Sequence, residues 1–173
     1  MLYLVIILLV AIDQLTKYLI VQNVDSNQAI SVIKGFFEIT NVKNTGGAFS
    51  FLSDTSWGIF VLASISGVIT IILVGVIIRL RNSDFKLIRI VLSILAAGTI
   101  GNLIDRVRVG SVIDFLMFTF GDYTFPVFNV ADICIVTSSI VLVIMLIFDK
   151  KILDALSKDN PPDKGIIDSN SGE

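Results

Sequence analysis

The chain has 173 residues, of which 54% are hydrophobic and 16% are charged, and its net charge is −2. This composition is too apolar for a soluble domain of this size and predicts an integral membrane protein, with no support for a nucleic-acid partner. Histidine is absent and there is one cysteine, which excludes Ser-His and Cys-His nucleophiles, the usual zinc sites and an intramolecular disulfide.

Four apolar runs are long enough to cross about 30 Å of hydrocarbon as helices that rise about 1.5 Å per residue. They cover residues 2–21, 57–78, 87–104 and 131–148. The first run could be a signal-peptide core, but no basic residue precedes it and no small-x-small cleavage site follows. We therefore expect an all-α membrane protein with four transmembrane helices.

The positive residues indicate how these helices are oriented. Two links are rich in lysine and arginine: the one between the second and third runs (Arg79, Arg81, Lys86, Arg89) and the segment after the fourth (Lys150, Lys151, Lys158, Lys164). The other two links hold only Lys34 and Lys43, and Arg106 and Arg108. The positive-inside rule then places both termini in the cytoplasm, an N-in/C-in topology.

One membrane domain, residues 1–149, accounts for the helices and two outer loops, 22–56 and 105–130. Within these loops, residues 36–42 partly alternate between apolar and polar, which favours a strand, and residues 118–125 form two alternating runs about a Gly-Asp turn, typical of a hairpin. We expect a small extracytoplasmic β-sheet at the membrane surface. The polar segment 150–173 is expected to be a disordered cytoplasmic tail.

The second run, residues 57–78, has no charged residue and is expected only to pack against its neighbours. The first run differs, because Asp13 and Lys17 stand four residues apart on one helix face. They are either a self-neutralising pair or part of a functional site. At the outer end of the third run, Asp105 and Arg106 are expected to hold a site together.

Asp114 and Asp132 are the strongest candidates for chemistry. Asn129 is a plausible N-cap for the fourth helix, so Asp132, three residues on, has an ordinary capping role available to it. The predicted hairpin could instead bring Asp132 next to Asp114. Two aspartates sharing one proton can activate water as a general base and protonate a leaving amine as a general acid. The helix N-terminus favours ionised Asp132, and hence protonated Asp114.

A nucleophilic serine with Lys17 as its base is a weaker alternative, because no sequence context pairs Ser50, Ser53 or Ser56 with that lysine. A small transporter would need polar groups along a path across the bilayer, and the inner halves of the third and fourth runs offer almost none. A purely structural membrane protein would leave the gathering of aspartates toward the outside as coincidence.

Five segments in order, DQLTK, NTGGAFS, AAGTIGNLIDR, VIDF and FNVAD, resemble the motifs of bacterial lipoprotein signal peptidase, also called signal peptidase II. The resemblance runs from about residue 2 to residue 148. Each motif alone is weak, but their order on this predicted topology is specific. Two departures are mild: Gly47 stands where alanine is common, and Thr99 where a smaller residue is usual.

The resemblance implies an intramembrane aspartic endopeptidase of the bacterial cytoplasmic membrane. We expect a monomer without a cofactor, and no metal, because neither histidine nor a cysteine cluster is present to ligate one. Its substrate would be a diacylglyceryl-modified prolipoprotein. The acyl chains of the substrate would anchor it in the membrane lipid, and the peptide would be cleaved before the lipidated cysteine. Asp114 and Asp132 would be catalytic. The positions that would shape or support the site are Asp13, Lys17, Asn44, Gly46, Gly98, Asn102, Asp105, Arg106, Asn129 and Ala131.

Overall fold

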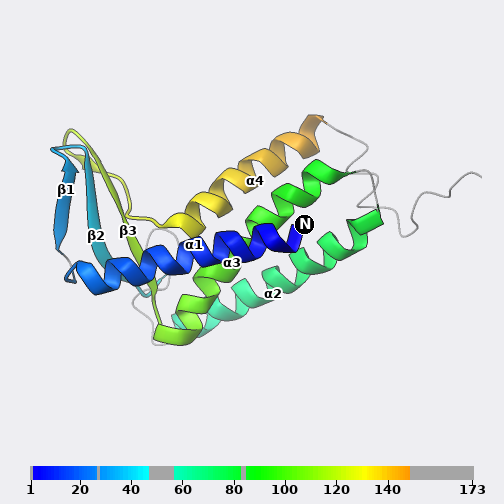
Figure 1. Ribbon diagram of the computed structural model, residues 1–173, viewed down its shortest axis with the longest axis horizontal. Helices are drawn as coiled ribbons and strands as arrows, with labels where there is room; N and C mark the ends of the chain where they lie inside the picture. The colour runs from blue at the N-terminus through cyan, green and yellow to red at the C-terminus, as the bar shows by residue number, and fades with distance from the viewer. Residues whose placement is uncertain (1, 27, 47–56, 83–84, 149–173) are drawn as a thin grey trace, which may run out of the picture.

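Figure 1 shows the chain in the computed structural model, which describes residues 2–26, 28–46, 57–82 and 85–148. The long helices are α1 (Leu2–Asn23), α2 (Gly58–Arg79), α3 (Lys86–Val109) and α4 (Val130–Phe148), and a short 3-10 helix, η2 (Leu80–Asn82), follows α2. All four long helices have the length and hydropathy to cross a membrane, which confirms the predicted spans. The segments 47–56 and 149–173, which include part of the NTGGAFS motif and the predicted tail, lie outside the described residues.

The central element of the bundle is α3. It packs against α1, α2 and α4, and Figure 1 shows α4 and α2 on opposite sides of it. More than half of α3 is buried, whereas the other three helices expose most of their apolar side chains, as helices facing lipid do. The buried face of α3 includes Ala96, Ala97, Gly98 and Gly101, small residues that let the neighbouring helices approach closely.

The end of α3 differs from the sequence-based prediction. The helix continues to Val109, five residues beyond the predicted end at residue 104, and Gly110 terminates it in the left-handed conformation at φ 70°. Hydropathy falls at Asp105, but the backbone continues to form helical hydrogen bonds. Asp105 and Arg106 therefore lie in the last turns of a helix and not in a loop.

A small antiparallel sheet lies at one end of the bundle, where α1 ends and α4 begins (Figure 1). Its order is β1 (Ala29–Ile33), β2 (Phe37–Asn44), β3 (Val112–Phe120) and β4 (Tyr123–Thr124). The predicted strand at 36–42 is confirmed as β2, and the predicted hairpin as β3 and β4 about Gly121. The edge strand β1 was not predicted, and β3 begins six residues earlier than the predicted hairpin.

A bulge in β2 lies beside Asp114. Ile39 pairs with Leu116 and Val42 pairs with Asp114, so β2 has one more residue than β3 between these pairs. The bulge turns two consecutive residues, Thr40 and Asn41, inward. The Asn41 amide uses this position to donate to the carbonyl of Val24, just beyond α1, at 2.8 Å, which ties the sheet to the bundle.

The chain returns from β4 to α4 along β3. The backbone N–H groups of Phe115 and Leu116 both donate to the carbonyl of Phe128, at 3.0 and 2.8 Å, and the N–H of Phe128 donates back to Leu116 at 3.2 Å. The Phe118 and Phe128 rings stack with their centroids 5.7 Å apart. These contacts place the start of α4 beside the start of β3.

Candidate active site

Asn129 links Asp114 to Asp132. Its side-chain Nδ2 donates to Asp114 Oδ1 at 2.7 Å, and its Oδ1 accepts a hydrogen bond from the backbone N–H of Asp132 at 2.9 Å. The N–H of Asn129 donates in return to Asp132 Oδ2 at 3.2 Å, which completes a capping box at the start of α4. Asp132 therefore does have the capping role that the sequence allowed, while lying close to Asp114.

The remaining oxygens of the two aspartates also accept hydrogen bonds. Asn44 Nδ2, at the end of β2, donates to Asp114 Oδ2 at 3.0 Å, and Asn102 Nδ2, on α3, donates to Asp132 Oδ1 at 2.7 Å. The backbone N–H of Gly46 donates to Asn44 Oδ1 at 3.0 Å and fixes which end of that amide faces Asp114. Side chains from β2, β3, α3 and the start of α4 thus meet at one place.

The protonation of Asp114 is set mainly by burial. The first four residues of β3, Val112 to Phe115, are all buried, and Asp114 itself is only 3% exposed. Burial, assisted by the nearby charge of Asp132, raises the pKa of Asp114 from 3.8 to about 6. The hydrogen bonds from Asn44 and Asn129 act in the opposite direction, because they stabilise the ionised form.

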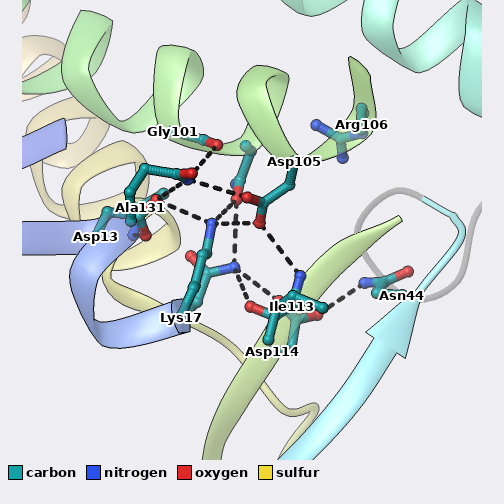
Figure 2. A network of polar contacts seen from close by, with 12 residues as sticks. Asp13, Lys17, Asn44, Gly101, Asp105, Arg106, Ile113, Asp114 and Ala131 are labelled. Carbon is teal, nitrogen blue, oxygen red and sulfur yellow. Dashed lines mark hydrogen bonds and ion pairs between the residues drawn. The ribbon is translucent and has the colours of Figure 1, made fainter. Parts of the chain in front are cut away.

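A second group of polar residues, Lys17, Asp13 and Asp105, lies beside Asp114, as Figure 2 shows. Lys17 is 1% exposed, and its Nζ contacts Asp13 Oδ2 and Asp105 Oδ2 at 2.9 Å each and donates to Asn102 Oδ1 at 3.0 Å. These three partners use all three hydrogens of the ammonium group. Lys17 is therefore a buried structural cation, and this arrangement does not suit a base that takes a proton from a serine.

Two glycines of α3 make room for these contacts. A Cβ on Gly101 would lie 2.5 Å from Asp13 Oδ2, and one on Gly98 would lie 2.5 Å from the backbone oxygen of Ala131. Neither atom can move far, because Asp13 is held by Lys17 and Ala131 belongs to the first turn of α4. Gly98 and Ala131 are on the predicted list of supporting positions, whereas Gly101 was considered only for helix packing.

Arg106 lies at the side of the site, and among the described residues it forms no hydrogen bond to Asp114 or Asp132. Its Nη1 donates to Ser66 Oγ of α2 at 3.4 Å, and Figure 2 shows its guanidinium apart from the polar group around Lys17. Thr99 of α3 also contacts α2, through a 3.2 Å hydrogen bond from the Thr70 hydroxyl. The prediction that the second run only packs was wrong, because α2 supplies polar partners to α3.

All ten predicted supporting positions are described, and seven of them contact the two aspartates or the group of Lys17, Asp13 and Asp105. The other three contact neighbouring residues instead: Gly46 donates to Asn44, Gly98 lies against Ala131 and Arg106 donates to Ser66. Sequence reasoning missed Gln14, whose Nε2 lies within hydrogen-bond distance of Asp13, Gly101 and Asp105. Its only signal was its place inside the DQLTK segment. The position of a glutamine in a helical sequence does not by itself indicate which other helix its side chain will contact.

The arrangement suits acid–base chemistry with one proton shared between two carboxylates. Asp114 is buried and holds its proton to a higher pH than usual, while Asp132 lies at a helix N-terminus that favours negative charge. Such a pair can take a proton from water with one carboxylate and supply a proton with the other.

Comparison with known families agrees with the motifs. The sequence profile described as Signal peptidase (SPase) II matches residues 5–148. The lipoprotein signal peptidase of Symbiobacterium thermophilum is 38% identical over 131 residues, which are 75% of this chain and 82% of that protein. The lipoprotein signal peptidase of Listeria monocytogenes serotype 4a is also 38% identical, over 84% of this chain and 90% of that protein.

Solved structures with the same fold have been described as bacterial membrane enzymes determined by the in meso method. One has a TM-score of 0.71 and 30% sequence identity, covering 92% of this chain and 93% of its own. A second has a TM-score of 0.68 and 32% identity, covering 86% of this chain and 93% of its own. The motifs, the fold and these similarities together establish that the chain belongs to the signal peptidase II family.

Proposed function

We propose that this protein is an intramembrane aspartic endopeptidase that removes the signal peptide from diacylglyceryl-modified prolipoproteins, cutting just before the lipidated cysteine. The observation that carries the proposal is the pairing of Asp114 with Asp132 through Asn129. Membership of the signal peptidase II family supports the substrate class. The two aspartates are the proposed catalytic pair, and the other predicted site residues are proposed to support them.

In the proposed reaction, the ionised carboxylate of Asp132 takes a proton from a water molecule as the water oxygen attacks the scissile carbonyl carbon. The carbon–nitrogen bond then breaks, and the leaving amine gains a proton from the acid pair. Protonated Asp114 is the natural donor, because burial favours its neutral form. The water supplies the hydroxyl of the new carboxyl group. Its other proton goes to Asp132 and replaces the proton that Asp114 gives to the amine, so the pair as a whole neither gains nor loses a proton.

The proposed N-in/C-in topology places this pair toward the outer leaflet. It rests on the lysines and arginines that follow α2 and α4, which favour the cytoplasmic side. The sheet end of the bundle would then face outward, where a lipid-anchored peptide is held by its acyl chains. Apolar side chains exposed on the helices suit the contact with those chains.

Transport is less well supported by the arrangement of polar groups. Buried charged side chains gather near the sheet, whereas an apolar cluster fills the other end of the α2–α3 contact: Leu73, Ile77, Leu80, Ile88, Leu92 and Ala96. A path for a polar solute would need polar partners at both ends. The aspartic peptidase therefore remains the proposed function.

Separate Asp114→Asn and Asp132→Asn variants test the proposal on a purified diacylglyceryl-modified prolipoprotein. Each should lower kcat by at least about 100-fold, since general acid–base catalysis contributes this much or more. Asp122→Asn is a matched control, because Asp122 is an exposed residue of the nearby β3–β4 turn. Near-normal turnover by either test variant, with folding verified by its thermal unfolding, would eliminate the proposed pair.

A further inference from the structure

Two buried carboxylates each hold the residue that immediately precedes one of the proposed catalytic aspartates. Asp13 Oδ1, on α1, accepts a hydrogen bond from the backbone N–H of Ala131 at 2.9 Å, next to Asp132. Asp105 Oδ2, on α3, accepts one from the backbone N–H of Ile113 at 3.3 Å, next to Asp114. The positions of Asp13 and Asp105 therefore help to set the positions of the two aspartates.

Two side chains of α1 join Asp13 to Asp105. Lys17 is the first bridge, with Nζ at 2.9 Å from an oxygen of each. Gln14 is the second: its Nε2, which carries two hydrogens, lies 2.9 Å from Asp105 Oδ1 and 3.2 Å from both Asp13 Oδ2 and the backbone oxygen of Gly101, so these acceptors share its hydrogens. Within the described part of the chain, Gln14 is the partner found for Asp105 Oδ1.

Charge explains why a neutral donor is needed here. Asp13, Asp105 and Lys17 are all buried, and two carboxylates with one ammonium group leave one negative charge in excess. A buried carboxylate oxygen without a donor is costly, and two carboxylates repel each other. The amide of Gln14 can donate to both Asp13 and Asp105 without adding charge. It also supplies a donor to Asp105 Oδ1, because Lys17 contacts the other oxygen, Oδ2.

We infer that Gln14 is a positioning residue for the peptidase reaction. Together with Lys17 it fixes the separation of Asp13 and Asp105, and through Ala131 and Ile113 the alignment of the proposed catalytic pair. Gln14 contacts neither aspartate of the pair and acts only through this group. The inference rests on the proposed function, because it assigns Gln14 a part in the same site.

The first test replaces Gln14 with methionine, which has a similar length and no hydrogen-bond donor. Gln14→Met should lower kcat by about 10- to 100-fold, the cost of a misalignment on the order of 1 Å, while KM changes less than about 2-fold. The matched control is Gln22→Met on the same helix, since Gln22 is exposed there. If Gln14 contributed only to packing, Gln14→Met would lower the thermal stability but would not lower kcat while leaving KM almost unchanged.

A second variant, Gln14→Glu, makes the bridge depend on protonation. The Gln14 amide contacts Asp13 of α1 and Asp105 of α3. Lys17 of α1 contacts both of these aspartates, and Asp132 of α4 lies beyond Asn102. A neutral glutamic acid keeps one donor, whereas an ionised one adds a third carboxylate. The ratio of kcat for Gln14→Glu to kcat for Gln14→Met should therefore rise as pH falls.

The inference is overturned if Gln14→Met keeps kcat within about 2-fold of the unaltered enzyme, or if the Glu-to-Met ratio does not change with pH. These outcomes are separate from a failure of the proposed function. If Asp114→Asn is inactive while Gln14→Met is fully active, only the role of Gln14 is wrong. If Asp114→Asn remains active in the same assay, the aspartic mechanism itself is wrong.

Discussion

Asn129 Nδ2 donates to Asp114 Oδ1 at 2.7 Å, across 15 positions of the chain and between the residue that precedes α4 and strand β3. The same asparagine is fully buried and caps α4 through its Oδ1. One amide thus combines two tasks: it begins the helix that carries Asp132, and it holds the strand that carries Asp114. The two tasks can be separated by substitution.

Asn129→Ser should separate them. Serine is as good an N-cap as asparagine, so the helix start should keep most of its stability, but its short side chain cannot donate to Asp114. Without this hydrogen bond Asp114 loses part of its alignment, and because a misplacement on the order of 1 Å can cost about 100-fold in rate, kcat should fall by about 10- to 100-fold. Initial rates and thermal unfolding in detergent measure the two effects.

Asn23→Ser serves as the control for this substitution, because Asn23 is exposed on α1 and, among the residues that the structure describes, donates to the carbonyl of Leu19 in its own helix. Its activity should be unchanged. Full activity of Asn129→Ser would show that the bridge is not needed, and an unfolded Asn129→Ser protein would show that the cap and the bridge are inseparable.

Gly101→Ala should destabilise the protein by about 1–3 kcal/mol, the usual cost of adding a methyl group to a packed interior. The new Cβ would lie 2.5 Å from Asp13 Oδ2, so the carboxylate must leave either Lys17 or Ala131. Chemical or thermal unfolding of the purified protein gives the change in the free energy of unfolding.

Gly75→Ala on α2 is the matched control, since no atom of the described residues lies within 4 Å of a Cβ at that position. It should be neutral or slightly stabilising, because alanine favours helix over glycine. Equal stabilities for the two variants would mean that α1 and α3 tolerate a wider separation than the contacts around Asp13 imply.

The pH dependence should follow Asp114. Its pKa is raised from 3.8 to about 6 in the folded protein, so the proton needed for catalysis is lost above about pH 6, and kcat/KM should fall there. The same shift affects stability: the contribution of Asp114 to folding is fully present below about pH 4 and is lost as pH rises through about 6.

Asn44→Leu should move the alkaline limb of this profile to higher pH. The hydrogen bond from Asn44 stabilises ionised Asp114, so its removal raises the pKa of Asp114 further. A pH–rate profile of the variant beside the unaltered enzyme provides the measurement. A limb that stays in place, or moves to lower pH, contradicts the assignment of that limb to Asp114.

Treatment with EDTA should leave activity unchanged. The oxygens of Asp114 and Asp132 accept hydrogens from amides, and Lys17 contacts one oxygen of Asp13 and one of Asp105. A hard divalent cation needs several oxygen ligands that are free to turn toward it. Activity that is lost with EDTA and restored by magnesium or calcium would contradict the metal-free mechanism.

The sequence by itself determined the membrane character and the chemical repertoire. Hydropathy is a property of consecutive residues, so the four spans could be predicted, although α3 continued past the charged residues at 105 and 106. The absence of histidine excluded catalysis by an imidazole, so carboxylates remained as the candidate catalytic groups. The motif resemblance pointed to Asp114 and Asp132, but nothing along the chain gave the distance between them.

Only the tertiary structure decided how these residues meet. Asp114 reaches Asn129 because the Phe128 backbone pairs with β3, and Lys17 has its three partners because Gly101 lets α1 approach α3. The role of Gln14 also depends on the tertiary structure, since its partners Gly101 and Asp105 are 87 and 91 positions away in the chain. Hydropathy and spacing describe neighbours along one element, whereas a buried hydrogen-bond network depends on contacts between elements that are far apart in the chain.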